Sequence, residues 1–220
     1  MIDIRRPMRS APPIWVKRHL IFLGKFEKCM RYTMPETGLQ LALEAGQSLP
    51  VHLCWRVNDG YLRATGKSDL AETYTLGVWG PGEILMPQLL NLQPVELRAL
   101  SRAWVHQWCP SPEEQQHCSR VQIEQMGMLL QITRVRPVEA RLFNLLVWLS
   151  DRFGSGAEQE PNVPLEAMNL THRQLAEMAS MSRVTVTKAL GQFRQQGWLK
   201  RVNESEVLSQ NIMTLFKGEG

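Results

Sequence analysis

The sequence has little cysteine, and none of it is arranged for metal binding. The four cysteines (Cys29, Cys54, Cys109 and Cys118) lie far apart, without the C-x-x-C pair that zinc knuckles and clustered iron–sulfur sites use. The five histidines are scattered as well, so a haem or metal ligand set is not expected. We therefore predict reduced thiols, no metal and no cofactor.

Long apolar runs are also missing. The longest one, Leu142–Leu149, is too short to cross a bilayer. Arginines stand at Arg5, Arg6 and Arg9, but no apolar core of signal-peptide length follows them. We therefore expect a cytoplasmic protein that does not enter a membrane.

The common motifs of catalysis are absent too. The sequence contains no Ser-His-Asp or Cys-His grouping, no P-loop and no dinucleotide fingerprint. The glycine-rich motif Gly80-Pro81-Gly82 is interpreted as a turn. We therefore predict that the protein is not an enzyme and has no catalytic residues.

What the chain does have is a local excess of positive charge. Its 220 residues are enough for two modules, and a hydrophobic content of 44% is that of a folded protein rather than a disordered one. The net charge of +4 is only mildly basic. Between Leu170 and Val202, however, one acidic residue, Glu177, stands against six basic ones: Arg173, Arg183, Lys188, Arg194, Lys200 and Arg201.

The sequence from about Leu39 to Trp108 predicts short strands separated by Gly, Pro and Asn. The turn signal Asn58-Asp59-Gly60 stands between two of them and predicts a hairpin. A small antiparallel sandwich or roll is expected. The predicted strands are Gln40–Glu44, Leu53–Val57, Tyr61–Ala64, Thr73–Val78, Leu97–Leu100 and Ala103–Trp108.

A long helix is predicted to begin after Ser111, because Ser111, Pro112 and Glu114 form a capping box with proline at the first helical position. A helix with two apolar stripes needs two surfaces to pack against, and a neighbouring β-domain supplies only one. We therefore expect a homodimer through the helix around 112–135. One stripe is heptad-like, with Cys118, Val121, Gln125, Met128, Ile132 and Val135, and the other has Ile123, Met126 and Leu130.

Two capped helices follow after an amphipathic helix between Pro137 and Gly154. Thr171 to Gln174 is a second capping box, and Ser182 caps a longer helix that runs to about Gln196. Only a tight turn separates the pair, as in a helix-turn-helix. On the second helix one side gathers apolar residues, Val186, Ala189, Leu190 and Phe193, and the opposite arc holds Arg183, Val184, Thr187, Lys188 and Gly191.

The arc headed by Arg183 fits the major groove of DNA, where arginine can bond guanine and Val184 can meet a thymine methyl group. Gly197 is expected to end the helix, and residues 198–202 are predicted to pair with 212–216 as a wing. The predicted DNA contacts are Thr171, His172, Arg173, Ser182, Arg183, Val184, Thr185, Thr187, Lys188, Lys200 and Arg201.

The stretch LTHRQLAEMASMSRVTVTKALGQFRQQGWLKR, residues 170–201, resembles the DNA-binding domain of the CRP/FNR superfamily of regulators, and its residues 182–188 resemble the recognition helix of the cyanobacterial global nitrogen regulators. The resemblance implies an α+β fold. It has an N-terminal double-stranded β-helix (a cyclic-nucleotide-binding-like β-roll) in 1–110, a dimerisation helix in 111–136 and a C-terminal winged helix-turn-helix in 137–220. It also implies base reading by Arg183, Val184 and Lys188 on a palindrome with GTA-type half-sites.

The resemblance also defines a candidate effector site, made of Gly82, Glu83, Ile84, Leu85, Arg98, Arg120 and Gln125. Cyclic-nucleotide binders of the family place an arginine about ten residues after the Gly-Glu turn, to neutralise the phosphate. Here that place falls near Gln93-Pro94, so cyclic AMP is not expected. Arg120 matches one of the two arginines with which nitrogen regulators bind 2-oxoglutarate.

These observations predict a sequence-specific DNA-binding transcription regulator. They leave open whether an effector gates it, whether it activates or represses, and whether RNA polymerase is a partner. The alternative is a protein-interaction module whose winged helix binds a protein. A steep salt dependence of DNA affinity distinguishes the two, because neutralising phosphates releases counterions.

Overall fold

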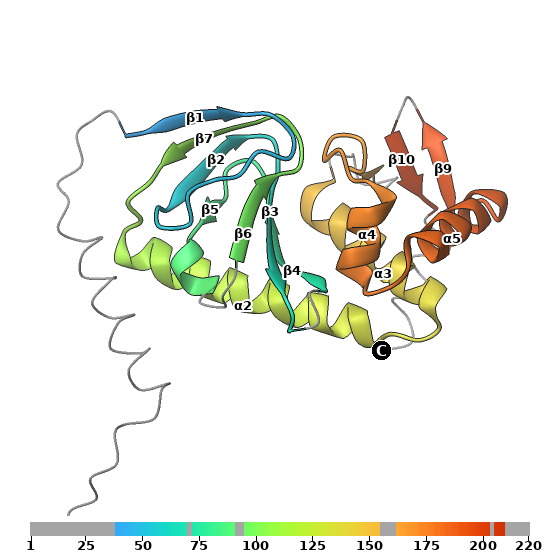
Figure 1. Ribbon diagram of the computed structural model, residues 1–220. Helices are drawn as coiled ribbons and strands as arrows, with labels where there is room; N and C mark the ends of the chain where they lie inside the picture. Colours follow the sequence, from blue (N-terminus) through green and yellow to red (C-terminus); the bar gives the residue numbers. More distant parts are fainter. Residues whose placement is uncertain (1–37, 70–71, 91–94, 155–161, 203–204, 210–220) are drawn as a thin grey trace, which may run out of the picture. The chain divides into compact units, whose positions relative to one another are not determined.

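The computed structural model describes residues 38–69, 72–90, 95–154, 162–202 and 205–209 (Figure 1). All of them belong to one compact unit of the chain. Among the described residues strands come first, a long helix follows, and shorter helices with a small sheet come last. The elements are β1 (Gln40–Leu43), β2 (Trp55–Asp59), β3 (Leu62–Lys67), β4 (Thr73–Trp79), β5 (Ile84–Leu85), η1 (Pro87–Leu90), β6 (Val95–Ala99), β7 (Ala103–Gln107), α2 (Pro112–Arg134), α3 (Val138–Phe153), β8 (Asn162–Val163), α4 (His172–Ala179), α5 (Arg183–Gln195), β9 (Leu199–Val202) and β10 (Ser205–Leu208).

The first seven strands form two antiparallel sheets, in the orders β1-β7-β2-β5 and β4-β3-β6. Residues from both sheets face a common apolar core, in which Trp55, Val57 and Leu62 have no exposed surface. The six predicted strands are confirmed with their ends shifted by a few residues, and the expected α+β fold with an N-terminal β-roll is confirmed. The two-residue strand β5 was not predicted.

The hairpin predicted at Asn58-Asp59-Gly60 is wrong, because β2 and β3 lie in different sheets. The turn carries the chain from one sheet to the other instead of pairing the strands on either side. Gly60 has a φ of +76°, and a Cβ at this position would stand 2.1 Å from the carbonyl oxygen of Arg102. A glycine is therefore required here by close backbone approach as well as by conformation.

Helix α2 begins at the predicted capping box, with Ser111 as its N-cap. Two buried glutamines fasten it to β4, an edge strand. Gln125 Oε1 accepts a hydrogen bond from the backbone N–H of Val78 (2.9 Å), and Gln122 Nε2 donates to the carbonyl oxygen of Leu76 (3.0 Å). The side-chain amides thus satisfy strand groups that have no neighbouring strand on this side.

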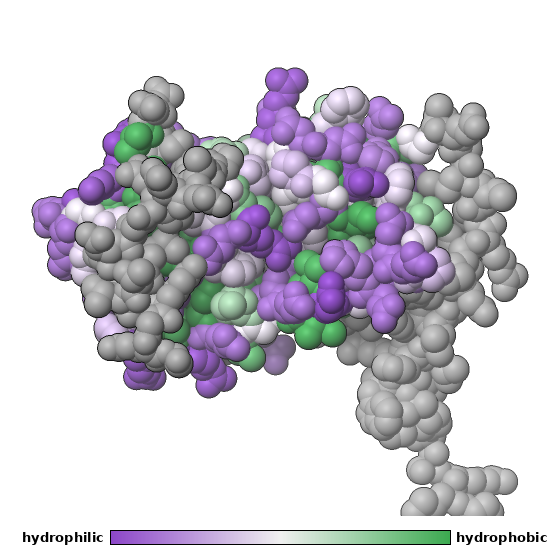
Figure 2. Space-filling view, turned by 180° about the vertical axis from the view of Figure 1, so that it is seen from behind, coloured by the Kyte–Doolittle hydropathy of each residue, from purple (hydrophilic) through white to green (hydrophobic). Residues whose placement is uncertain are grey.

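The predicted heptad seam of α2 does not face outward as one stripe. Cys118, Gln125 and Ile132 are buried within the chain, whereas Met128 of the same seam is exposed. In the second stripe Ile123 and Leu130 are exposed, whereas Met126 packs against the core of the β-roll. Figure 2 shows from behind that apolar side chains reach the surface in patches among hydrophilic ones. None of the helices in the described ranges is long and apolar enough to cross a membrane.

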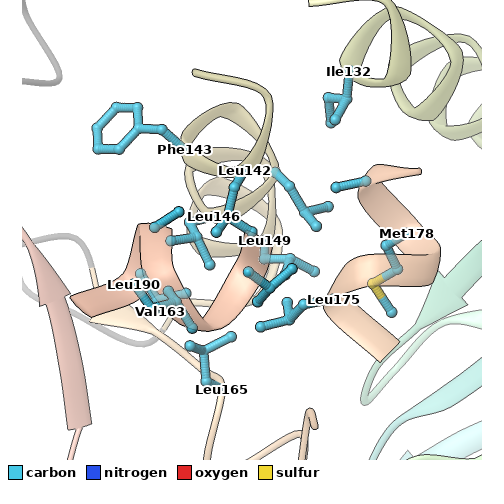
Figure 3. Close-up of a cluster of buried hydrophobic side chains, with 14 of the residues drawn as sticks. Ile132, Leu142, Phe143, Leu146, Leu149, Val163, Leu165, Leu175, Met178 and Leu190 are labelled. Carbon is cyan, nitrogen blue, oxygen red and sulfur yellow. The ribbon is translucent and has the colours of Figure 1, made fainter. Parts of the chain in front are cut away.

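The helices α3, α4 and α5 share a second core. Leu142, Leu146 and Leu149 of α3 lie toward Leu175 of α4 and Leu190 of α5 (Figure 3). The core also includes Val78 and Leu100 of the β-roll region and Ile132 of α2, so it continues from the last helices to the first half of the chain. The predicted bounds of the α3 helix are confirmed.

A wing follows α5, as expected, but its second strand was misplaced. Strand β9 pairs with β10, in the register Leu199 to Leu208, and β8 adds a third strand. Residues 212–216, the predicted partner, lie outside the described residues, as do Cys29, His19 and the Gln93-Pro94 pair. Gly197, with a φ of +72°, ends α5 in the left-handed conformation as predicted.

Candidate nucleic-acid interface

Helix α4 starts and stops through its own side chains. Thr171 Oγ1 accepts a hydrogen bond from the backbone N–H of Gln174 (3.2 Å), and Gln174 Oε1 accepts one from the backbone N–H of Thr171 (2.8 Å). Ser180, with a φ of +50°, ends the helix in the left-handed conformation. The chain therefore turns sharply between α4 and the next helix.

Helix α5 is capped and held from one side. Ser182 Oγ accepts a hydrogen bond from the backbone N–H of Thr185 (3.0 Å). On the inner face Phe193 stacks on Trp198 and meets the edge of Phe143 at a ring-centroid distance of 5.9 Å. The predicted inner residues are all buried: Val186, Ala189, Leu190 and Phe193. This packing leaves the opposite side of α5 free to meet a ligand.

The cap of α5 offers a stability test. Ser182→Ala is expected to lower the free energy of unfolding by about 1 kcal/mol, because the side-chain acceptor for the Thr185 N–H is lost. Urea denaturation measures this. Ser182→Asn is the control and is expected to keep wild-type stability, since asparagine caps helices as well as serine does. Equal losses in both variants would mean that the cap contributes nothing.

The outer face of α5 combines charge with an exposed apolar residue. Arg183, Thr187 and Lys188 are exposed, and the side chain of Val184 between them is 63% exposed. A valine this exposed in the first turn of a helix has no packing role in the described part of the chain. Beside arginine and lysine it has the chemistry needed to read the edge of a base pair.

A hydrogen bond joins the two helices at this face. His172 Nδ1 lies 2.9 Å from Thr187 Oγ1, and Thr187 Oγ1 also donates to the carbonyl oxygen of Arg183 (3.0 Å). The start of α4 is thereby fixed against the first half of α5. The histidine and the threonine were predicted separately as DNA contacts, and the fold brings them together.

The wing adds two cations from β9. Lys200 and Arg201 are both exposed, and Arg201 forms an ion pair with Glu166 (3.1 Å). The β10 strand is tied to α5 by the ion pair between Arg194 and the buried Glu206. Of the eleven predicted DNA contacts, the structure leaves nine exposed and two, His172 and Thr185, half-buried.

Sequence reasoning missed the carboxylates that hold these cations. Glu177 accepts a hydrogen bond from Arg173 Nε (3.1 Å). The i, i+4 spacing on α4 was a usable signal for that pair. The pairing of Glu166 with Arg201 joins residues far apart in the sequence, and no local pattern could have indicated it.

The candidate effector residues of the Gly-Glu turn are already engaged. Glu83 accepts hydrogen bonds from the backbone N–H of Gly80 (2.8 Å) and from Arg152 of α3 (2.8 Å). Burial raises the pKa of the Glu83 carboxyl, although Arg152 acts in the opposite direction. Gly82 has a φ of +85°, and Ile84 and Leu85 form β5 beside β2.

The three other effector candidates do not form a shared clamp. Arg98 pairs with Glu96 (3.2 Å), Arg120 pairs with Glu124 (3.8 Å), and both arginines are exposed. Gln125 is buried and bonded to β4. Among the described residues no hydrogen bond or ion pair joins two of the seven candidate side chains. Nor does that part of the chain hold three His, Cys, Asp or Glu side chains grouped for a metal ion.

Two capped helices that cross at a tight turn, with a cationic outer face and a wing behind them, define a winged helix-turn-helix DNA-binding protein. Residues 140–215 match the family described as Crp-like helix-turn-helix domain. The chain is 34% identical over 151 residues to the Regulatory protein CysR of Synechococcus elongatus, covering 68% of this chain and 73% of that protein.

Solved structures show the same fold. TTHB099, a CRP-family transcriptional regulator of Thermus thermophilus, matches with a TM-score of 0.63 at 16% identity, over 82% of this chain and 97% of that one. FixK2 of Bradyrhizobium japonicum matches with a TM-score of 0.65 at 12% identity, over 82% and 96%. The chain belongs to the CRP/FNR superfamily of DNA-binding transcription regulators.

Proposed function

We propose that the protein regulates transcription as a homodimer that reads a palindromic operator with α5. The outer face of this helix carries the proposal, because Arg183, Val184 and Lys188 lie exposed on one arc while the inner face is fully packed. In a major groove Arg183 bonds guanine O6 and N7, Val184 contacts a thymine methyl group, and Lys188 meets a second base or a phosphate.

The first turns of α5 also bear on the operator sequence. Residues 182–188 resemble the recognition helix of the cyanobacterial nitrogen regulators, which supports half-sites of GTA type. The relative at 34% identity is itself a regulatory protein of a cyanobacterium. A palindrome follows from two-fold symmetry, because each protomer of a dimer presents the same helix to one half-site.

The dimer is proposed to form through α2. On this helix Ile123 is 72% exposed and Leu130 is 59% exposed, two turns apart on one face. An open hollow of about 490 Å³ lies at the Leu130 end of this row, lined by Leu130, Gln131, Arg134 and Val135. Large apolar side chains in a row on a surface helix support burial against a second copy of the same helix.

We further propose that DNA binding does not require a small-molecule effector. Glu83 of the Gly-Glu turn forms an ion pair with Arg152, and Gln125 accepts a hydrogen bond from the edge strand β4. The domain divisions at 110 and 136, an RNA polymerase contact and a cytoplasmic location stay predictions.

The experiment that tests the function is selection of binding sites from a random duplex library by the purified protein. Selection is carried out without ligand, with 2-oxoglutarate and with cyclic AMP. A palindrome with GTA-type half-sites recovered equally in all three supports the proposal. Enrichment only with a ligand would overturn the effector-free part, and no enrichment in any condition would overturn DNA reading by the purified chain.

Lys200 supplies a test of the wing. Lys200→Ala is expected to weaken binding to all duplexes by a similar factor, because an exposed lysine on β9 meets phosphates rather than bases. The slope of log affinity against log salt is expected to become less steep by about 1 per protomer. Titrations of an operator and a scrambled duplex measure both. A loss confined to the operator would place Lys200 on a base instead.

A further inference from the structure

One carboxylate connects the proposed DNA face with the β-roll. Glu177 of α4 accepts a hydrogen bond from Arg173 Nε through Oε1 (3.1 Å) and one from Arg63 Nη1 through Oε2 (2.9 Å). Arg173 is 81% exposed, Glu177 is 20% exposed and Arg63 is 5% exposed. The three side chains therefore form a line from solvent to the interior.

The inner end of this line is firmly placed. Arg63 is the second residue of β3, and its Nε and Nη2 both donate to Thr75 Oγ1 on the neighbouring strand β4 (3.1 and 2.6 Å). Burial lowers the pKa of Arg63, and Glu177 counteracts that shift. A buried arginine needs a carboxylate partner, since an unpaired buried charge is strongly unfavourable. The β-roll therefore determines where the Glu177 carboxylate stands.

The charges on this line bear on how strongly Arg173 can attract a phosphate. Two cations and one anion leave a net charge of +1 beside the DNA face. Without Arg63 the remaining pair of Glu177 and Arg173 would be neutral, and both carboxylate oxygens would be free to hold Arg173. An arginine held in this way attracts a phosphate group less, because the neighbouring carboxylate repels the phosphate.

We propose that Glu177 reduces the charge that Arg173 offers to the DNA backbone, and that Arg63 in the β-roll limits this reduction by holding part of the Glu177 carboxylate. The proposal rests on the assignment of Arg173 to the DNA face. It makes the docking of the β-roll on α4 a determinant of DNA affinity, although Arg63 itself is buried away from the ligand.

A second link between the same regions provides the matched control. Arg152 of α3 donates to Glu83 of the β4–β5 turn (2.8 Å), and both side chains are largely buried. Neither residue contacts a predicted DNA contact. Breaking this link by Arg152→Gln removes an ion pair of similar burial between the same parts of the chain without changing the charge near Arg173.

The experiment measures DNA affinity and its salt dependence for the full chain and five variants: Arg63→Met, Arg173→Ala, Glu177→Gln, the double variant R63M/E177Q and Arg152→Gln. Arg63→Met is expected to lower affinity about fivefold at low salt and to reduce the salt slope by about 1 per protomer. Glu177→Gln keeps a side-chain oxygen that can accept the hydrogen bond of Arg63, and it is expected to bind at least as well as the wild type. Arg152→Gln is expected to stay within about twofold of it.

The decisive comparison is between the double variant and Glu177→Gln alone. If Arg63 acts through Glu177, adding Arg63→Met to Glu177→Gln changes affinity no further. The same loss in both backgrounds, or an equal loss in Arg152→Gln, would overturn the proposal, because the effect would then come from loosened docking. Arg63→Gln, which can still donate to Thr75, takes the place of Arg63→Met if the latter does not fold.

Failure of this proposal is distinguishable from failure of the proposed interface. If Arg173→Ala leaves affinity and salt slope unchanged, Arg173 does not meet a phosphate, and the interface is wrong at this position. If Arg173→Ala weakens binding but Arg63→Met does not, the interface stands and the control by Arg63 is wrong.

Discussion

Arg183→Ala is expected to abolish the preference for one base pair in each half-site while leaving the preferences at other positions in place. Arg183 stands exposed in the first turn of α5, directly after the Ser182 cap. A bidentate arginine–guanine contact contributes about 1–3 kcal/mol of discrimination. Because two protomers read the palindrome, Arg183→Ala is expected to weaken the free energy of binding to the operator by roughly 2–6 kcal/mol. This corresponds to about a 30-fold to 10⁴-fold loss of affinity.

Competition titrations with operators substituted at one symmetric position at a time measure this effect. The wild type is expected to reject substitutions at the position read by Arg183, and the variant is expected to accept all four bases there. Lys200→Ala is the control, because it is expected to weaken every duplex equally. An Arg183→Ala variant that binds more weakly but keeps all its base preferences would place Arg183 on a phosphate.

Helix starts were predictable from the sequence because they depend on local groups. Ser111, Thr171 and Ser182 each bond the backbone of their own first turn, within three residues. The DNA face follows from the same local order, since a helix with a packed inner side fixes which residues point outward. The positions of Arg183, Val184 and Lys188 therefore needed no knowledge of the tertiary fold.

Strand pairing was less predictable because it depends on distant residues. An Asp59-Gly60 pair between two strands favours a hairpin locally. Gly60 instead lies against the backbone of Arg102, about forty residues later, and the chain crosses to the other sheet. The strand pairing of the wing was also hard to predict. Strand β9 pairs with the short strand β10, and β10 contains a charged residue, Glu206, that is buried.

The candidate effector site was the least predictable part, for an electrostatic reason. The resemblance placed Glu83 at a ligand turn, and nothing local to that turn indicates its partner. Arg152 lies on α3, 69 residues away, and donates to Glu83 in the folded chain. Arg98 and Arg120 likewise have carboxylate partners on their own elements, Glu96 and Glu124. Charges assigned to a ligand were thus already paired within the chain.

Helix α2 carries apolar residues that are buried in this chain and others that are exposed. The exposed ones lead to the second prediction with a large expected effect. Gln125 and Ile132 of the predicted seam pack against this chain's own core, while Ile123 and Leu130 stay exposed. Leu130→Glu is expected to convert the dimer to a monomer, because two carboxylates would face each other in the buried interface. Sedimentation or light scattering measures the mass, and affinity for the palindrome is expected to fall about 10²-fold to 10⁴-fold as bivalent binding is lost.

Met128→Glu is the matched control for this change. Met128 is 41% exposed on the same helix, five residues from Ile123 and therefore on a different arc. Met128→Glu adds the same charge at an apolar position. The variant is expected to stay dimeric with wild-type operator affinity. Dissociation by both variants would mean that the interface covers more of α2 than the Ile123–Leu130 stripe. A Leu130→Glu protein that remains a dimer with wild-type operator affinity would contradict an interface at the Ile123–Leu130 stripe.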